Sequence, residues 1–168
     1  AGLTEEEINS SYQSLIRLLT NVDPQVIMEI ANSIWYRDDF PISADFVERN
    51  EEFFDAVVRG LDFSAPSAVQ TINDWVAQNT QDKIPSIVDR ITPQDTLILV
   101  NAIYFKATWK DRFDPAKTAD RPFNRVDGSV VQVPSMQMEG KITTYTDGTV
   151  TAVDLPYGGG VFSMTLLV

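Results

Sequence analysis

The longest apolar stretch of the sequence, residues 96–109, places the strongest constraint on the fold. Its sequence is TLILVNAIYFKATW, and apart from Asn101 its centre is apolar at both alternating sets of positions. A strand with one solvated face alternates apolar and polar residues, whereas a strand covered on both faces is apolar throughout. The stretch therefore predicts a strand inside a large sheet that is covered on both faces. It also raises the question of what Asn101 does there.

Helix and strand patterns alternate before this stretch. Thr4 and Glu7 form a capping box that opens a helix, and this helix ends at the break in residues 21–24. Further elements are expected in this order: a strand at 26–36, a helix capped by Ser43, a short strand near 57–63, and a helix at 67–80 capped by Ser67 or Ser64. Apolar residues recur at helical spacing in the first helix, at Ile8, Tyr12, Leu15 and Leu19. In the second helix Phe46, Phe53 and Phe54 would anchor it to a core, and in the third Val69, Ile72 and Val76 form one stripe.

From residue 110 onward the pattern is that of strands and turns alone. We expect strands near 121–123 and after the Asp127-Gly128 turn, and then a meander that turns at Asp147-Gly148 and at the glycines of 158–160. The final stretch, VFSMTLLV, has the composition of a central strand, and domains rarely end inside such a strand. We therefore expect the chain to be part of a longer protein.

Composition removes several classes of function. The 168 residues include no Cys and no His, which excludes thiolate nucleophiles, disulfides, imidazole bases and most zinc sites. The net charge of −11, without a local basic patch, disfavours nucleic acid and anionic membranes as partners. No apolar run is long enough to span a bilayer, and the first ten residues lack the pattern of a signal peptide. We expect no cofactor and no metal.

Acidic clusters and a glycine run are weaker candidate sites. The stretches TEEE and ERNEE are compatible with a glycosidase pair or a metal site, but on helices such clusters usually form a solvated face. The stretch YGGG lacks the lysine and the strand-to-helix context of a phosphate-binding loop, which favours a hairpin turn. An enzyme is therefore disfavoured.

The residues around Asn101 carry a family resemblance. The stretch LVNAIYFKATWKDRFDPAKTADRPF resembles the serpin signature, and INDWVAQNTQDKI is similar to the serpin helix that lies across the main sheet. VQVPSM and VDLPYGGGVFSMTLLV match the strands that follow in that family. The chain departs from the family at Ala107 and Asp82, where glycine is usual, and at Ser135, where a second methionine is usual. These departures concern local turn geometry. Several motifs occur in the same order along the chain as in the family, which makes the resemblance specific.

The resemblance implies an α+β fold in which helices pack on a large mixed β-sheet, with the start of a second antiparallel sheet. Residues 1–168 would be the central part of a single serpin domain. Helices and central-sheet strands would occupy 1–109, and strands of the second and third sheets would occupy 110–168. This domain would be incomplete, without its amino-terminal helices and its reactive-centre loop.

The resemblance also implies a suicide inhibitor of serine or cysteine proteases. Such an inhibitor presents a loop as bait and traps the acyl-enzyme by inserting the cleaved loop into the sheet beside residues 96–109. The alternative is a non-inhibitory serpin, acting as a carrier, chaperone or storage protein. The hinge of the loop, which separates these alternatives, lies outside this chain.

Several expectations about partners follow from the resemblance. The target protease would bind through the absent loop, so this chain alone should be inactive, and it should need the rest of the protein or self-association to stay soluble. The helix that resembles the heparin-binding one has Arg17 as its only basic residue, so heparin activation is not expected. The family favours an extracellular or periplasmic location.

Asn101 and Trp109 each have a structural and a functional interpretation. Asn101 is either an amide satisfied within a strand or part of the family's shutter, a latch whose donors and acceptor can be re-paired when strands separate. Trp109 is either a core or rim aromatic residue or part of the breach where insertion begins, with Lys106 nearby. The helix at 67–80 either simply covers the sheet or is displaced as the loop passes. By resemblance, the shutter and breach residues are Asn73, Thr80, Ile84, Asn101, Phe105, Lys106, Trp109 and Thr118.

Overall fold

The structure of the protein is a computed structural model, and it describes residues 2–168. The chain forms two compact units. The first contains the residues up to Val22 together with Ile27–Lys106, and the second contains Asp23–Val26 together with Ala107–Val168. None of the helices in residues 2–168 has both the length and the apolar character needed to span a bilayer.

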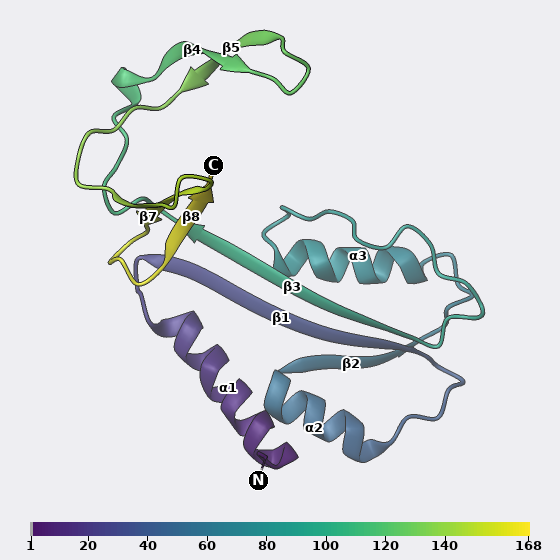
Figure 1. The fold of residues 1–168 in the computed structure, drawn as a ribbon. Coiled ribbons are helices and arrows are strands. Elements are labelled where there is room, and N and C mark those ends of the chain that lie inside the picture. The colour runs from purple at the N-terminus through teal and green to yellow at the C-terminus, as the bar shows by residue number, and fades with distance from the viewer. Residues whose placement is uncertain (1) are drawn as a thin grey trace. The chain divides into compact units, whose positions relative to one another are not determined.

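The first unit has three α-helices, which are α1 (Glu5–Asn21), α2 (Ala44–Phe54) and α3 (Ala68–Asn79) (Figure 1). The predicted capping box of α1 is confirmed. Thr4 Oγ1 accepts from the backbone N–H of Glu7 at 3.2 Å, and the Glu7 carboxylate accepts from the N–H of Thr4 at 2.7 Å. This pair satisfies two backbone donors that the first turn leaves free.

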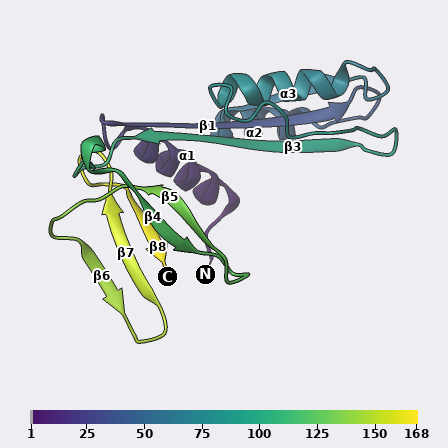
Figure 2. The ribbon, with the colours of Figure 1, turned by 90° about the horizontal axis from the view of Figure 1, so that it is seen from above.

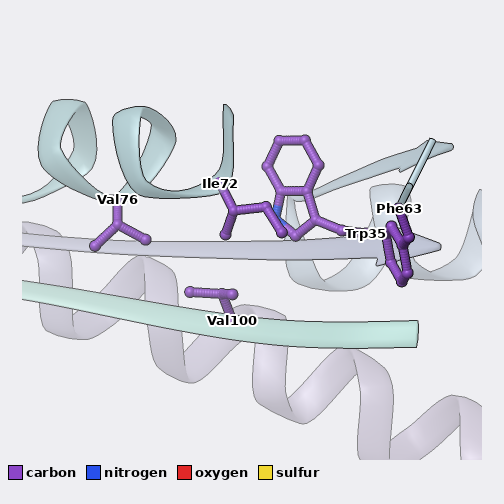
Figure 3. Packing of buried hydrophobic residues seen from close by; sticks show 5 residues of the cluster. All are labelled: Trp35, Phe63, Ile72, Val76 and Val100. Carbon is purple, nitrogen blue, oxygen red and sulfur yellow. The ribbon is translucent and has the colours of Figure 1, made fainter. Parts of the chain in front are cut away.

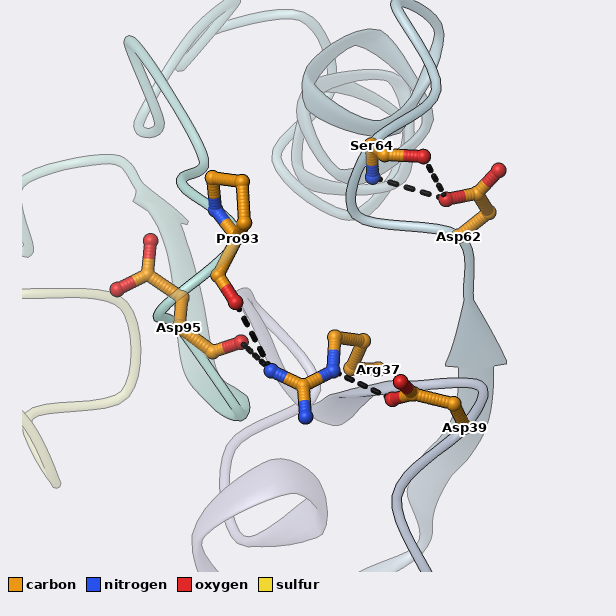
Figure 4. Close-up of polar contacts among 6 residues, drawn as sticks. All are labelled: Arg37, Asp39, Asp62, Ser64, Pro93 and Asp95. Carbon is orange, nitrogen blue, oxygen red and sulfur yellow. Dashed lines mark hydrogen bonds and ion pairs between the residues drawn. The ribbon is translucent and has the colours of Figure 1, made fainter.

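The serines predicted to cap the other two helices are at the predicted positions but do not form the predicted hydrogen bonds. Ser43 and Ser67 occupy the N-cap positions, but neither side chain makes a capping hydrogen bond. Ser64 instead donates from its backbone N–H and its hydroxyl to Asp62, at 2.9 and 2.6 Å, in the turn before α3 (Figure 4). The bend that leads into α3 is therefore stabilised by a carboxylate.

A three-stranded mixed sheet forms the centre of the first unit. Its order is β2 (Ala56–Leu61), β1 (Val26–Arg37) and β3 (Leu97–Ala107). Strands β1 and β2 are parallel, with Asn32 opposite Ala56 at one end of the pairing. Strand β3 runs in the opposite direction to β1 (Figures 1 and 2). The expected helices on a mixed sheet are therefore present.

Helix α3 covers one face of this sheet (Figure 2). Its residues Ile72 and Val76 are fully buried and pack in one cluster with Trp35, Phe63 and Val100 (Figure 3). Burial of side chains of this size stabilises a fold by about 1.5–3 kcal/mol each. The predicted apolar stripe is thus confirmed at Ile72 and Val76.

Helix α2 contributes less to the core than its sequence predicts. None of its residues is buried, and Phe46 is 38% exposed, so the expectation that Phe46 anchors the helix is wrong. Phe54 instead contacts the ring of Tyr12 in α1, with 4.8 Å between ring centroids. The aromatic residues of α2 therefore join it to a neighbouring helix.

Among residues 2–168, strand β3 is covered on one face only. Val100 and Ala102 are buried on the side of α3, whereas Leu99, Ile103 and Phe105, at the alternate positions, are 69, 53 and 38% exposed. Within residues 2–168, the expectation of a strand covered on both faces is therefore wrong. The described residues supply a covering layer, α3, for one face.

The second unit consists of β structure and one short 3-10 helix, η1 (Pro115–Lys117). A hairpin pairs β4 (Ala119–Asn124) with β5 (Val130–Ser135), and a meander joins β6 (Thr143–Thr146), β7 (Thr151–Pro156) and β8 (Ser163–Leu167) in that order. All pairings within these two sheets are antiparallel.

The predicted glycine turns of the second unit are confirmed. Gly128 and Gly148 have φ of 81° and 90°, values that favour glycine in tight turns. Strand β8, expected from its composition to be central, lies at the edge of the meander within the described residues.

Candidate functional site

Asn101 links three elements of the first unit through a relay of amides. Its Nδ2 donates to Oδ1 of Asn32 in β1 at 2.8 Å, and Nδ2 of Asn32 donates to the carbonyl oxygen of Phe54 at the end of α2, also at 2.8 Å. Asn101 is exposed, and its side-chain amide is hydrogen-bonded to Asn32 on the uncovered face of β3 among residues 2–168. Asn32 was not predicted from the sequence, because its partner lies 69 residues away.

Asn73 fixes the segment that follows α3. Its Oδ1 accepts from the backbone N–H groups of Ile87 and Val88 at 2.9 and 3.0 Å, and its Nδ2 donates to the carbonyl oxygen of Val88 at 2.9 Å. The residue is only 6% exposed. The buried amide of Asn73 therefore joins this irregular segment to α3 through three hydrogen bonds.

Thr80 determines how α3 ends. Its hydroxyl is buried, donates to the carbonyl oxygen of Val76 at 2.8 Å and accepts from the N–H of Ile84 at 3.1 Å. Asp82 follows with φ of 59°, and its N–H donates to the carbonyl oxygen of Ala77 at 2.8 Å. Asp82, at the position where the family usually has glycine, therefore has a left-handed backbone conformation.

Four of the predicted site residues line one open groove of about 490 Å³. They are Thr80, Ile84, Phe105 and Lys106, and the groove lies between the end of α3 and the second half of β3. Strand β3 is last in the sheet order, so among residues 2–168 the edge away from β1 has no strand partner. Such an edge offers backbone N–H and C=O groups to an added strand.

Arg37 holds the start of β3 in place (Figure 4). Its guanidinium donates to the carbonyl oxygens of Pro93 and Asp95 at 2.9 and 3.4 Å and pairs with the carboxylate of Asp39. Hydrogen bonds from the backbone N–H and hydroxyl of Thr92 lower the pKa of Asp95. The sequence did not reveal this contact, because it joins the end of β1 to a loop more than 50 residues away.

Trp109 and Thr118 belong to the second unit and take no part in this groove. The Trp109 ring stacks on Tyr157 at 4.4 Å with an interplanar angle of 12°, and meets Phe113 edge to face at 6.1 Å. The Thr118 N–H donates to the carbonyl oxygen of Pro115 and ends η1. Trp109 is therefore the centre of an aromatic cluster where the chain enters the second unit.

The glycine run at 158–160 forms a turn, as predicted, and Asp23 holds it. The Asp23 carboxylate, 5% exposed, accepts from the N–H of Gly159 at 2.8 Å. A Cβ at Gly158, where φ is 47°, would lie 2.9 Å from that carboxylate. Because the Asp23 carboxylate already accepts a hydrogen bond from the Gly159 N–H, this donor is not free to bind phosphate as in a phosphate-binding loop.

Taken together, these elements define a class of protein: an α+β domain with a helix packed on one face of a mixed sheet, followed by antiparallel strands. The family model described as "Serpin (serine protease inhibitor)" matches residues 2–168. The chain belongs to the serpin family.

Relatives of known sequence and structure agree with this assignment. Neuroserpin of Homo sapiens is 32% identical over 99% of this chain and 47% of that protein, and glia-derived nexin of Homo sapiens is 35% identical over 83% of this chain and 37% of that protein. The crystal structure of the thermophilic serpin tengpin in its native state matches with a TM-score of 0.88 and 27% identity, covering 99% of this chain and 42% of tengpin. The chain thus spans less than half the length of these relatives, and the predicted serpin fold is confirmed.

Proposed function

We propose that the complete protein is a suicide inhibitor of serine or cysteine proteases that traps the acyl-enzyme by inserting its cleaved reactive loop beside β3. The observation that carries this proposal is that, among residues 2–168, β3 has no strand partner on the side away from β1, in a chain that matches serpins over these same residues. A strand added there would gain main-chain hydrogen bonds along Leu97–Ala107. The complete protein would have no catalytic activity of its own.

The amide relay has a defined role in this proposal. The Asn101–Asn32 bond joins β3 to β1, which is its neighbour on the side away from the open edge. It would therefore keep the two strands together while a new strand enters at the other edge.

The groove beside the open edge contains the residues expected to respond to insertion. Thr80 and Ile84 follow α3, and Phe105 and Lys106 lie on β3. A strand that enters this edge would pass the end of α3, so α3 would have to move and return. Trp109, where the chain enters the second unit, would belong to the breach by resemblance, and Thr118 would be one of the shutter and breach residues.

A gel assay on the complete protein tests the proposal. The protein is mixed with trypsin, chymotrypsin, elastase and subtilisin, and a band that survives denaturation at the summed mass is expected with at least one protease. Two controls should give no such band: a protease whose catalytic serine is replaced by alanine, and residues 1–168 alone, which lack the bait loop.

Cleavage without a stable complex would contradict the proposal. If the cleaved protein also showed no rise in melting temperature, the loop would not have entered the sheet, and a non-inhibitory role as carrier, chaperone or storage protein would follow.

A further inference from the structure

The segment that links α3 to β3, residues 80–96, is held at several points along its length. In Figure 1 it runs back from the end of α3 to the start of β3. Val88 and Ile91, in its second half, pack against the cluster that contains Trp35. We call residues 80–96 the return segment. Because it is continuous with α3, a displacement of α3 requires some of these contacts to open.

The two halves of the return segment are held by side chains that differ in burial. Over the first half these side chains are buried, since Thr80 is 1% exposed and Asn73 is 6% exposed. Over the second half, the Arg37 side chain is 29% exposed and donates to the carbonyl oxygens of Pro93 and Asp95 (Figure 4). Hydrogen bonds that water can reach open more readily than buried ones. We therefore expect the return segment to open first at the end that Arg37 holds.

Arg37 is placed to hold that end because it is the last residue of β1 and is itself fixed. Its backbone N–H donates to the carbonyl oxygen of Thr96 at 3.0 Å, and its guanidinium pairs with the carboxylate of Asp39. The turn that it holds is closed by bonds of its own, because the N–H and hydroxyl of Thr92 donate to the Asp95 carboxylate at 2.7 and 3.0 Å. A guanidinium has its donors in a rigid, planar fork, so one side chain can bind a carboxylate and carbonyl groups at once. Arg37 therefore joins a preformed turn to β1.

We propose that Arg37 is a positioning residue for loop insertion: by holding the end of the return segment, it limits how readily α3 moves and so sets how fast a strand can pair along β3. This inference rests on the proposed function, because it concerns the step in which the cleaved loop enters beside β3. Asp39 supports the contact by fixing the orientation of the guanidinium. Loosening the contact should therefore speed insertion.

Hydrogen exchange of the complete protein tests the contact itself. Arg37→Met keeps an unbranched apolar stem and the backbone bond to Thr96 but removes the guanidinium. We expect the amides of Thr92 and Asp95 to exchange about tenfold faster, because their turn loses its bonds to β1. Arg59→Met is the matched control on the adjacent strand β2, since Arg59 makes no ion pair among residues 2–168, and it should change this exchange by less than about twofold.

Peptide uptake tests the role in insertion. The probe is a synthetic peptide with the sequence of the protein's own reactive loop, and its uptake by the complete protein is followed by the melting temperature of samples taken over time. We expect uptake about fivefold faster in Arg37→Met, and an intermediate rate in Arg37→Lys, which has a point charge but no fork of donors. Asp39→Asn should also speed uptake. Asp38→Asn, the same change at a residue without an ion pair among the described residues, should leave uptake within about twofold of the parent protein.

The number of inhibitor molecules consumed per trapped protease separates positioning from a general loss of stability. In a suicide inhibitor the acyl-enzyme is either trapped by insertion or hydrolysed and released, so faster insertion lowers this number. Titration against a protease for which the parent protein is partly consumed as substrate should therefore give a lower number for Arg37→Met. A variant that was merely destabilised would lose active inhibitor and give a higher number.

Three outcomes would overturn the inference. If exchange at Thr92 and Asp95 accelerates in Arg37→Met but peptide uptake and inhibitor consumption stay unchanged, the contact does not limit insertion, and the proposed function stands. If exchange is also unchanged, Arg37 does not hold the return segment. If the parent protein takes up no peptide and forms no protease complex, the proposed function fails and this inference fails with it.

Discussion

Replacing Asn73 by alanine tests how firmly the segment after α3 is held. The change removes three hydrogen bonds, those with the N–H groups of Ile87 and Val88 and with the carbonyl oxygen of Val88. Each contributes about 1 kcal/mol, and Ile87 is 51% exposed, so water replaces part of what is lost. We expect the free energy of local opening of this segment to fall by about 2–3 kcal/mol.

Hydrogen exchange of the complete protein measures this effect directly. The amides of Ile87 and Val88 donate to Asn73, and a loss of 2–3 kcal/mol corresponds to exchange that is roughly 30- to 140-fold faster. Asn79→Ala is the matched control, because the Asn79 side chain donates only to Trp75 within its own helix. It should leave the exchange of Ile87 and Val88 unchanged. If Asn73→Ala changed their exchange by less than threefold, the three bonds would not be what holds the segment.

Two further predictions concern stability. Asp82→Gly should stabilise the complete protein by about 0.5–1 kcal/mol, because the strain that glycine removes from the left-handed backbone at φ of 59° exceeds the entropy that it adds to the unfolded chain. The control Asp74→Gly, inside α3, should destabilise the protein by about 1 kcal/mol. Equal effects of the two changes in thermal melts would refute the argument. Stability should also fall in acid. Hydrogen bonds from neighbouring N–H and hydroxyl groups lower the pKa of five carboxyl groups, so their contribution is complete above the unfolded-state pKa of about 4 and is lost as pH falls through the lower folded-state values. Melting temperatures from pH 7 to pH 2 should show this decline, Thr4→Val should make it shallower by freeing Glu7, and an unchanged slope would count against it. The five groups are Glu7, Asp62, Asp95, Asp127 and Asp147.

Local signals in the sequence were sufficient for most of the elements. The capping box at Thr4 and Glu7, the stripe through Ile72 and Val76, and the turn at Gly128 each depend on residues a few positions apart, and each is confirmed. Such features are decided by helix ends, side-chain periodicity and backbone freedom, which a short window of sequence contains. The fold class followed from a resemblance made of several such windows in order.

Features that join distant parts of the chain could not be predicted in the same way. The bond between Asn32 and Asn101, the clamp of Arg37 on residues 93–95, and the contact of Asp23 with Gly159 each depend on which segments the fold brings together. A single polar residue in a sequence does not identify its partner. The exposure of Ile103 was also missed, because an apolar pattern indicates that a face tends to be covered but not by which segment.

The amide pair of Asn101 and Asn32 has a consequence for how β3 finds its place beside β1. Shifting a strand by one residue turns its side chains to the opposite face, and shifting it by two would put Leu99 or Ile103 where Asn101 now lies. Neither apolar side chain can accept or donate to Asn32, so every slipped alignment leaves that amide with one partner fewer. A single asparagine in an otherwise apolar strand thus makes one alignment lower in free energy than its neighbours, much as one buried asparagine selects the alignment of a coiled coil.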